Sequence, residues 1–194
     1  MFLTLVLFSY LLGSIPSALI VGKLGYNIDI REFGSGNLGA TNTFRILGIK
    51  AGIIVTIADI LKGIIAGLLP IFFSVDINIL LIGLFASIGH IFPIFAKFKG
   101  GKAVATSAGV LIAYNYQIFL IALLIFIITL YLFKMISLAS ITSAIFVFLY
   151  AIVFNSSDNL LVGILGVLAF FITFLHKENI KRIKNKTESK IKWL

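Results

Sequence analysis

Long apolar runs alternate with short polar segments along the whole chain. The runs are continuous and lack the period-two alternation of a half-exposed strand, so they favour helices. A helix that crosses the hydrocarbon layer of a membrane needs about 20 mostly apolar residues. The pattern therefore predicts seven membrane-spanning helices, at residues 2–22, 52–73, 77–95, 103–114, 117–133, 138–154 and 159–175.

The fourth run, 103–114, is short for a span, so its length also allows one long helix over 103–133 or a re-entrant segment. The positions of lysine and arginine favour two separate spans. With seven spans every Lys and Arg except Lys62 falls on one side, whereas a fused helix would move Lys134 to the other side. Because cytoplasmic loops are enriched in these residues, we expect the N-terminus outside and the C-terminus in the cytoplasm.

The composition agrees with a membrane setting, since 60% of the residues are hydrophobic, 12% are charged, and the mean hydropathy is +1.15. Only helices and closed barrels satisfy every backbone group in lipid, and continuous apolar runs do not suit barrel strands. We therefore expect an all-α integral membrane protein in which residues 1–194 form one polytopic domain. The first run lacks a basic leader and a clear cleavage site, so we expect it to be a helix of the mature protein.

Charge and cysteine content exclude several other classes. The net charge of +9 would suit a nucleic-acid-binding protein, but the placement of the cations is accounted for by the membrane topology, so no nucleic-acid partner is expected. The chain has no cysteine, which excludes disulfides and thiolate metal sites. Two distant histidines and few loop carboxylates make a poor ligand set, so we expect no metal and no cofactor.

Three polar stretches on the expected cytoplasmic side carry the candidate chemistry. The first is EFGSGNLGATNTFR, residues 32–45. Its glycines allow positive φ, so successive backbone N–H groups could turn inward as a nest for an anion, with the Ser35 hydroxyl as a further donor. Arg45 could hold a phosphate through two hydrogen bonds. The alternative is a flexible turn. Because Gly34 and Ser35 are adjacent, the G-x-S-x-G pattern of a nucleophile elbow is absent.

The second stretch, residues 89–106, contains three lysines and the adjacent pair Gly100 and Gly101. Lys102 directly follows the glycines and is the lysine best placed to bind an anion. The stretch is not a nucleotide P-loop, because an alanine stands where the first glycine is required and another alanine follows the lysine.

Several ionisable groups of the spans and loops have structural interpretations. Lys97 and Lys99 fit the positive-inside pattern without any further role. His90 is interpreted as a packed, hydrogen-bonded histidine, with catalysis as the alternative. Asp59 and Lys62 form the one oppositely charged pair deep in an apolar run. Such charges are functional candidates, but their spacing of three residues predicts an ion pair that fixes helix packing.

The third stretch, HKENIKR, directly follows the last apolar run. If the helix continues there, His176, Asn179 and Arg182 project from neighbouring faces, towards the place where the first two stretches would meet. Contacts with lipid head groups account for Lys177 and Lys181, but they account poorly for the histidine and the asparagine.

In combination these stretches resemble one family, the bacterial acyl-phosphate glycerol-3-phosphate acyltransferases (PlsY). The resemblance covers nearly the whole chain, through seven spans and the patterns GSGN-GA-N, GH-P-F-F-GGK-AT and H-NI-R. A serine pair of the family is matched by Ser137 and Ser140. The third motif of the family usually has a glycine before Thr-Glu, where this chain has Lys186, so we assign no precise role to residues beyond Arg182.

The resemblance implies transfer of a fatty acyl group from acyl phosphate to the sn-1 hydroxyl of glycerol 3-phosphate. The products would be lysophosphatidic acid and inorganic phosphate, in the first acylation step of phospholipid biosynthesis. The implied partners are acyl phosphate, glycerol 3-phosphate, membrane lipid and an upstream acyl-phosphate synthase that supplies the donor. The implied location is the bacterial cytoplasmic (inner) membrane, with the active site facing the cytoplasm.

The resemblance also implies residue roles. The catalytic set is Ser35, Arg45, Lys102, His176 and Asn179, and the substrate-binding set is Gly34, Gly36, Asn37, Gly39, Asn42, Gly100, Gly101, Ser140 and Arg182. Four residues of the first stretch would hold phosphate: Gly34, Ser35, Gly36 and Arg45. Lys102 would neutralise the departing or attacking anion, and glycerol 3-phosphate would be oriented by Ser140, His176 and Asn179. The base that removes the proton from the hydroxyl could be either His176 or a phosphate oxygen of the substrate. No carboxylate is spaced to orient the histidine, which favours the phosphate.

Two other classes of protein fit the same features less well. A transporter for an anionic solute would usually place its site near the bilayer midplane, whereas these polar stretches gather at one face. A non-catalytic scaffold would leave three glycine- and donor-rich loops unexplained.

Overall fold

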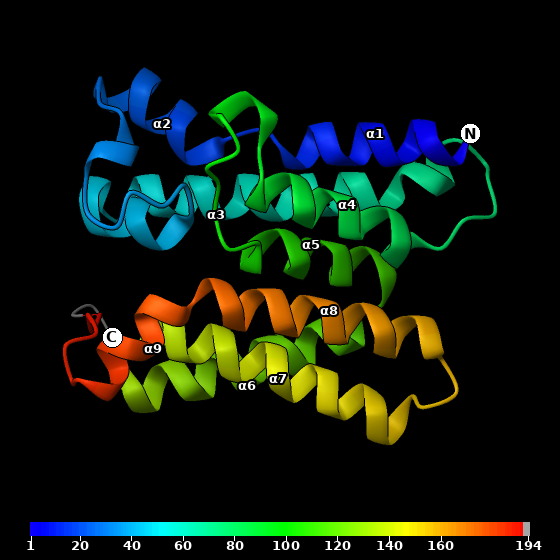
Figure 1. Ribbon diagram of the computed structural model, residues 1–194. Coiled ribbons are helices and arrows are strands. Elements are labelled where there is room, and N and C mark those ends of the chain that lie inside the picture. The colour runs from blue at the N-terminus through cyan, green and yellow to red at the C-terminus, as the bar shows by residue number, and fades with distance from the viewer. Residues whose placement is uncertain (192–194) are drawn as a thin grey trace. The chain divides into compact units, whose positions relative to one another are not determined.

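The computed structural model describes residues 1–191, and its regular elements are all helices (Figure 1). The chain divides into two compact units, Met1–Tyr114 and the remainder from Asn115 onward, each described by itself. The first contains α1 (Phe2–Gly13), α2 (Ser17–Tyr26), η1 (Ile30–Glu32), α3 (Ala40–Phe72), α4 (Ile79–Ile91), η2 (Ile94–Ala96) and α5 (Val104–Tyr114). The second contains α6 (Tyr116–Phe133), α7 (Ile136–Phe154), α8 (Asn159–Leu175) and α9 (Lys177–Lys184).

The helices support an all-α membrane protein. Over the described residues, five segments are long and apolar enough to span a membrane, with α1 and α2 taken together as one of them. A sixth is possible if α8 and α9, which meet at 58°, count as one span, while α5 is a shorter apolar helix. The predicted count of seven, the orientation and the single domain over 1–194 stay predictions.

Two predicted boundaries differ from the structure. The run 2–22 is broken between α1 and α2, because Pro16 lacks an N–H and disfavours helix in the residue before it. The second span belongs to a longer helix, α3, so residues 40–45, predicted as loop, are helical. A sharp kink at Gly48, with φ 84° and ψ −177°, separates this N-terminal segment from the apolar part.

Close contacts between small residues hold the helices of the first unit together. A side chain on Gly63 of α3 would overlap the carbonyl oxygen of Thr106 on α5, and one on Gly109 would overlap that of Ile60. Membrane helices associate through packing of this kind, since burial of apolar surface gives little drive within lipid.

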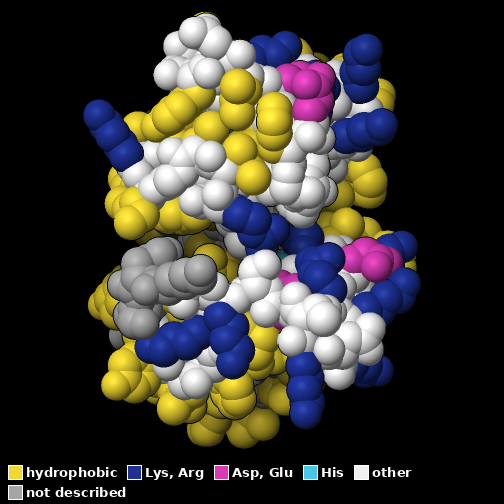
Figure 2. Space-filling model, turned by 90° about the vertical axis from the view of Figure 1, so that its left-hand side faces the viewer, with side chains coloured by type: hydrophobic (Ala, Val, Ile, Leu, Met, Phe, Trp, Pro, Cys, Tyr) yellow, Lys and Arg dark blue, Asp and Glu magenta, His cyan; other side chains and the backbone are white. Residues whose placement is uncertain are grey.

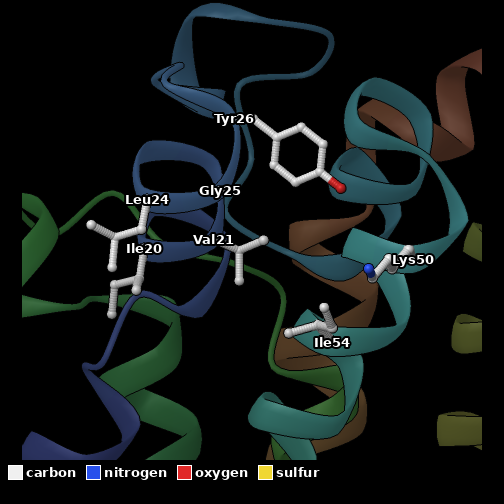
Figure 3. Close-up of a pocket in the computed structure, with 7 residues that line it drawn as sticks. All are labelled: Ile20, Val21, Leu24, Gly25, Tyr26, Lys50 and Ile54. Carbon is white, nitrogen blue, oxygen red and sulfur yellow. The ribbon is translucent and has the colours of Figure 1, made fainter.

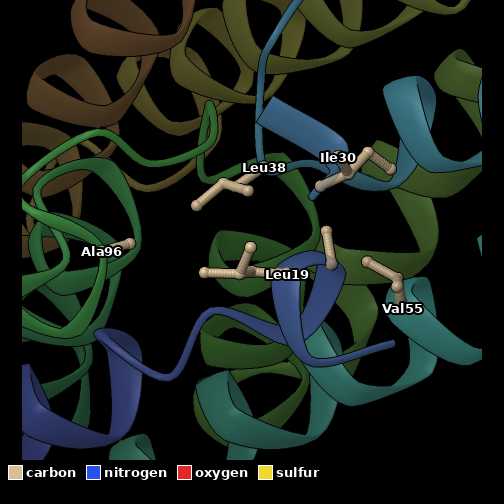
Figure 4. Packing of buried hydrophobic residues seen from close by; sticks show 6 residues of the cluster. Leu19, Ile30, Leu38, Val55 and Ala96 are labelled. Atoms are coloured by element: carbon tan, nitrogen blue, oxygen red, sulfur yellow. The ribbon is translucent and has the colours of Figure 1, made fainter. Parts of the chain in front are cut away.

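A buried cluster at the α2 end of the first unit joins parts of the chain that are distant in sequence (Figure 4). It contains Ala18, Leu19, Ile30, Leu38, Val55 and Ala96. Ile30 and Leu38 flank the glycines of the first polar stretch, and Ala96 belongs to the second. Packing therefore places the first two stretches against one another in one unit.

The second unit is formed by α6, α7 and α8 side by side, with α9 turning away at His176 (Figure 1). The chain after α9 returns to the beginning of α7, where the N–H of Ile191 donates to the carbonyl of Lys134 at 2.8 Å. This return brings residues of the C-terminal segment next to the first turn of α7.

Lysine and arginine gather at one end of each unit. In Figure 2, Lys and Arg side chains outnumber acidic ones at the α2 end of the first unit and, taken separately, at the α9 end of the second. That the cations of both units share one side of a membrane stays a prediction. One of these cations, Lys192, lies outside the described residues.

Candidate active site

Asn42, in the first turn of α3, organises the first polar loop. Its side-chain oxygen accepts a hydrogen bond from the N–H of Ser35 at 2.9 Å. Its amide nitrogen donates to the carbonyl oxygens of Phe33 at 3.1 Å and Ile30 at 3.4 Å. The side chain is buried, with 2% exposed. Because the loop uses both ends of this amide, Asn42 shapes the loop, while its predicted contact with substrate stays a prediction.

The predicted positive φ angles are present in this loop, at 63° for Gly34 and 68° for Gly36. The predicted nest requires inward-facing N–H groups that can bind an anion, but two of these N–H groups have partners within the loop. The N–H of Ser35 is bonded to Asn42, and that of Gly36 donates to the carbonyl of Phe33 at 3.0 Å. These two amides are therefore engaged within the loop.

Two arginines near this loop are in different electrostatic settings. Arg31 forms two hydrogen bonds to Asp29, at 2.9 and 2.6 Å, and these bonds lower the pKa of Asp29 to about 2. Arg45 is exposed, and within residues 1–191 no acidic side chain pairs with it. Arg31 thus holds the loop through Asp29, whereas Arg45 forms no such ion pair in the described chain. Just before α3, Asn37 accepts a hydrogen bond from the N–H of Gly39 at 2.9 Å.

The second loop is built around the backbone of its glycine pair. The N–H of Gly101 donates to the carbonyl of His90 at 2.9 Å, and the carbonyl of Gly100 accepts a hydrogen bond from the N–H of Leu38 at 3.4 Å. The latter bond joins the second loop to the first. Lys102, half-buried, ends the loop immediately before α5. The structure therefore brings Lys102 and the glycine loop of Ser35 into one unit.

The predicted ion pair of Asp59 and Lys62 is present, with 2.8 Å between Oδ1 and Nζ, and both side chains are buried. His90 is also buried, with 6% exposed, and its Nδ1 lies 3.7 Å from the same Asp59 oxygen. This agrees with the interpretation of His90 as a packed histidine.

His176, between α8 and α9, is held by the backbone. Its Nδ1 lies 2.7 Å from the carbonyl oxygen of Ile172. A carbonyl only accepts, so Nδ1 carries the hydrogen, and Nε2 is the basic nitrogen of the neutral ring. The side chain is 5% exposed.

Glu188 connects Asn179 and Arg182 of the third stretch to Ser137, a role that we did not predict. One carboxylate oxygen accepts hydrogen bonds from Ser137 Oγ and Asn179 Nδ2, both at 2.7 Å. The other accepts from Arg182 Nε, also at 2.7 Å. A residue beyond Arg182 therefore has a structural role, because Glu188 fixes both predicted site residues of α9. The remaining predicted residue here, Ser140, is buried and donates to the carbonyl of Ile136 at 2.9 Å.

The pKa of Glu188 reflects these contacts. Burial by itself would raise the pKa, but the hydrogen bonds from Asn179, Ser137 and Arg182 and the charge of Arg182 outweigh it, so the net pKa is lowered. The carboxylate is ionised at neutral pH and can keep all three donors in place. The Thr-Glu pair in the third motif of the family, which includes Glu188 here, could have indicated this role from the sequence.

The structure thus assembles the predicted residues in two groups. The first unit holds the loop of Ser35 and Arg45 together with the glycine pair and Lys102. The second holds Asn179 and Arg182, both bonded to Glu188, together with His176 and Ser140. Among residues 1–191 no three His, Asp or Glu side chains are arranged to hold a metal ion.

An apolar groove lies between α2 and α3 of the first unit (Figure 3). Its walls are Ile20, Val21, Leu24 and Gly25 of α2 and Ile54 of α3. Tyr26 and Lys50 add a hydroxyl and an ammonium group to this otherwise apolar lining. The groove has the composition to accept an extended apolar chain that ends in an anionic group.

Comparison with known proteins shows a relationship over nearly the whole length. Residues 3–186 match the family model described as glycerol-3-phosphate acyltransferase. The glycerol-3-phosphate acyltransferase of Bacillus subtilis is 55% identical over 98% of this chain and 97% of its own. That of Listeria monocytogenes is 52% identical over 97% and 96%.

Two solved structures are similar in fold. The crystal structure of PlsY, an integral membrane glycerol 3-phosphate acyltransferase, in its glycerol 3-phosphate form superimposes with a TM-score of 0.90 at 38% identity. Its lysophosphatidic acid form gives 0.86 at 37% identity. Each match covers 98% of this chain and 95% of that chain.

Proposed function

Because the chain belongs to the glycerol-3-phosphate acyltransferase family, we propose that it transfers a fatty acyl group from acyl phosphate to glycerol 3-phosphate. The hydroxyl oxygen at sn-1 attacks the acyl carbon, the bond between that carbon and the phosphate oxygen breaks, and the products are lysophosphatidic acid and inorganic phosphate. The observation that carries this proposal is the family relationship over almost every residue, including all three polar stretches.

The site residues suit a reaction between two phosphorylated molecules. Bringing two phosphates together is strongly unfavourable without fixed cations, above all near a medium of low dielectric constant. Arg45 has no acidic partner in the described chain, and Lys102 ends the glycine loop that is bonded to the loop of Ser35. We assign phosphate binding to Ser35 and Arg45, and neutralisation of the departing or attacking anion to Lys102.

The second group of residues would orient the acceptor. In this role Asn179 and His176 contact glycerol 3-phosphate, Ser140 and Arg182 add further donors, and Glu188 holds the asparagine and the arginine in register. His176 is oriented by a backbone carbonyl. We assign removal of the hydroxyl proton to a phosphate oxygen of the substrate, with His176 as the alternative base.

No covalent acyl-enzyme is needed in this scheme. Acyl phosphate is a mixed anhydride that already carries a good leaving group, so positioning and electrostatic stabilisation can supply the catalysis. Loss of one well-placed donor is expected to lower the rate by a factor on the order of 10² to 10³.

The acyl chain of the donor would lie along the apolar groove between α2 and α3. The groove is lined by aliphatic side chains and has Lys50 to meet the acyl-phosphate head. We place the reaction in the bacterial cytoplasmic membrane, with its polar residues facing the cytoplasm. The donor must then come from an upstream enzyme that makes acyl phosphate.

A donor competition in proteoliposomes tests the proposed activity. Purified protein is given glycerol 3-phosphate with acyl phosphate, acyl-CoA or acyl carrier protein, and formation of lysophosphatidic acid is measured. We expect product from acyl phosphate alone. Product only from another donor would refute the proposed donor. Uptake of glycerol 3-phosphate into sealed vesicles without any product would identify a transporter instead.

Substitutions in both units test the assigned roles. Lys102→Ala should abolish turnover, whereas Lys99→Ala, an exposed lysine of the same loop, should retain it. His176→Ala and Asn179→Ala should each raise KM for glycerol 3-phosphate. Full activity in the first variant, or unchanged KM in the other two, would remove those residues from the site.

A further inference from the structure

A buried charged cluster lies next to the glycine pair of the second loop. Asp59 Oδ1 accepts a hydrogen bond from Ser17 Oγ at 2.9 Å and lies 2.8 Å from Lys62 Nζ. Lys62 Nζ also donates, at 3.0 Å, to the carbonyl of Ile15 in the break between α1 and α2. The cluster thus connects that break to α3. All of these side chains and that of His90 are at most 6% exposed.

Stability alone is a weak explanation for such a cluster. A buried ion pair can often be replaced by apolar residues of similar volume without loss of stability. Charges at membrane depth are rare and usually serve function. The proposed reaction gives Asp59, Lys62 and His90 no contact with substrate, so another role has to account for them.

His90 connects this cluster to the loop. The Nδ1 edge of its ring faces Asp59 Oδ1 at 3.7 Å. The Nε2 edge faces Gly101 so closely that a Cβ on that glycine would overlap the ring. The backbone carbonyl of His90 also accepts the N–H of Gly101 at 2.9 Å. The ring therefore lies between the carboxylate and the backbone immediately before Lys102.

We propose that Asp59, Lys62 and His90 are positioning residues for the catalytic loop. The ion pair fixes the position of the Asp59 carboxylate. The carboxylate and the helix backbone orient the His90 ring. The ring then fixes the backbone of Gly101 and hence the position of the Lys102 ammonium group. This inference rests on the proposed function, in which Lys102 neutralises phosphate. A displacement of about 1 Å at a reacting centre can lower the rate by a factor of about 10².

An exchange of volume between His90 and Gly101 tests the contact directly. His90→Ala and Gly101→Ala should each lower kcat/KM, by up to about 10²-fold, at temperatures well below the measured Tm. The double variant should recover most of the loss, because the new methyl group occupies space that the ring has left. Failure of the double variant to recover, at an unchanged Tm, would overturn the proposal.

Gly100→Ala is the matched control. A Cβ there would meet the carbonyl oxygens of His90 and Ile91 and the side chain of Pro93, none of which changes in His90→Ala. His90→Ala should therefore not rescue Gly100→Ala. Equal rescue at both glycines would show a general loosening of the loop and would refute a specific contact of the ring with Gly101.

The double variant Asp59→Leu with Lys62→Met separates positioning from folding. It removes both charges together, so the Tm should stay near that of the wild type. With the carboxylate gone, kcat/KM should still fall. Wild-type kinetics in this variant would show that the pair has no positioning role.

Hydrogen exchange at the Gly101 amide gives a readout that does not need turnover. This N–H is bonded to the backbone carbonyl of His90, which His90→Ala retains. If the ring holds the loop in place, its loss or misplacement should make the loop open more often, so exchange over residues 99–106 should accelerate in His90→Ala and in the charge-free double variant. If the wild type forms no lysophosphatidic acid, the proposed function fails while the exchange rates still test the positioning. Unchanged exchange in both variants would contradict it.

Discussion

Replacing Glu188 by glutamine should loosen the third stretch although the two side chains have nearly the same shape. The carboxylate accepts from Ser137 and Asn179 with one oxygen and from Arg182 with the other. In Glu188→Gln one oxygen becomes an NH₂ group. If the remaining oxygen keeps the first two donors, the NH₂ faces the Nε–H of Arg182, and a charge-assisted bond becomes a contact between two donors.

The magnitude follows from the kinds of bond that change. A hydrogen bond to a charged group contributes about 1.5–3 kcal/mol. The two bonds that remain weaken from charge-assisted to neutral, so the loss in unfolding free energy should be roughly 3 kcal/mol in total. If Asn179 loses one hydrogen bond to the substrate, about 1.4 kcal/mol, KM for glycerol 3-phosphate should rise about tenfold.

Thermal unfolding in detergent and the kinetics of lysophosphatidic acid formation measure both effects. Glu178→Gln is the matched control, since Glu178 is an exposed carboxylate of α9 that pairs with Lys181 at 3.1 Å. Such a surface pair contributes about 0–1 kcal/mol. Equal Tm and KM in the two variants would refute the reasoning.

The lowered pKa of Glu188 also predicts how the effect depends on pH. The carboxylate contributes its full stabilisation to the fold above the ordinary pKa of a glutamate. The contribution is lost as pH falls through the lowered pKa, so the variant's disadvantage should shrink in acid.

Three further predictions concern the first unit. Asn42→Ala removes three hydrogen bonds that shape the Ser35 loop, so kcat/KM should fall and Tm should decrease, with a loss of about 1–3 kcal/mol; wild-type kinetics would contradict this. Gly48→Ala places a Cβ in open space but on a backbone of φ 84°, so it should lower the unfolding free energy of the protein by about 1–3 kcal/mol. The control is Gly163→Ala, at an equally open helical position without positive φ, which should be neutral or stabilising in the same melting assay. Hydrogen bonds and the charge of Arg31 lower the pKa of Asp29 to about 2, so Asp29→Asn should lower Tm at pH 6. This difference should shrink as pH falls from about 4 through about 2, and a difference of undiminished size at pH 2 would exclude the ionised carboxylate as its cause.

The sequence alone determined features that depend on neighbours along the chain. Continuous apolar runs predict helices in lipid whatever their partners, because every backbone group must be bonded within its own segment. The spacing of Asp59 and Lys62 predicts an ion pair on one face of one helix, and glycines at 34 and 36 permit the positive φ that both adopt. The three polar stretches were visible for the same reason, as interruptions of an apolar pattern.

Only the tertiary structure decided what those stretches contact. Asn42 bonds the loop that precedes its own helix, and the N–H of Leu38 reaches Gly100. Ser137 and Glu188 meet although 51 positions separate them. No local period relates such residues, because packing of whole helices brings them together. The sequence shows which polar groups need hydrogen-bond partners in a buried site. Those partners depend on which helices pack side by side and on where the chain turns back.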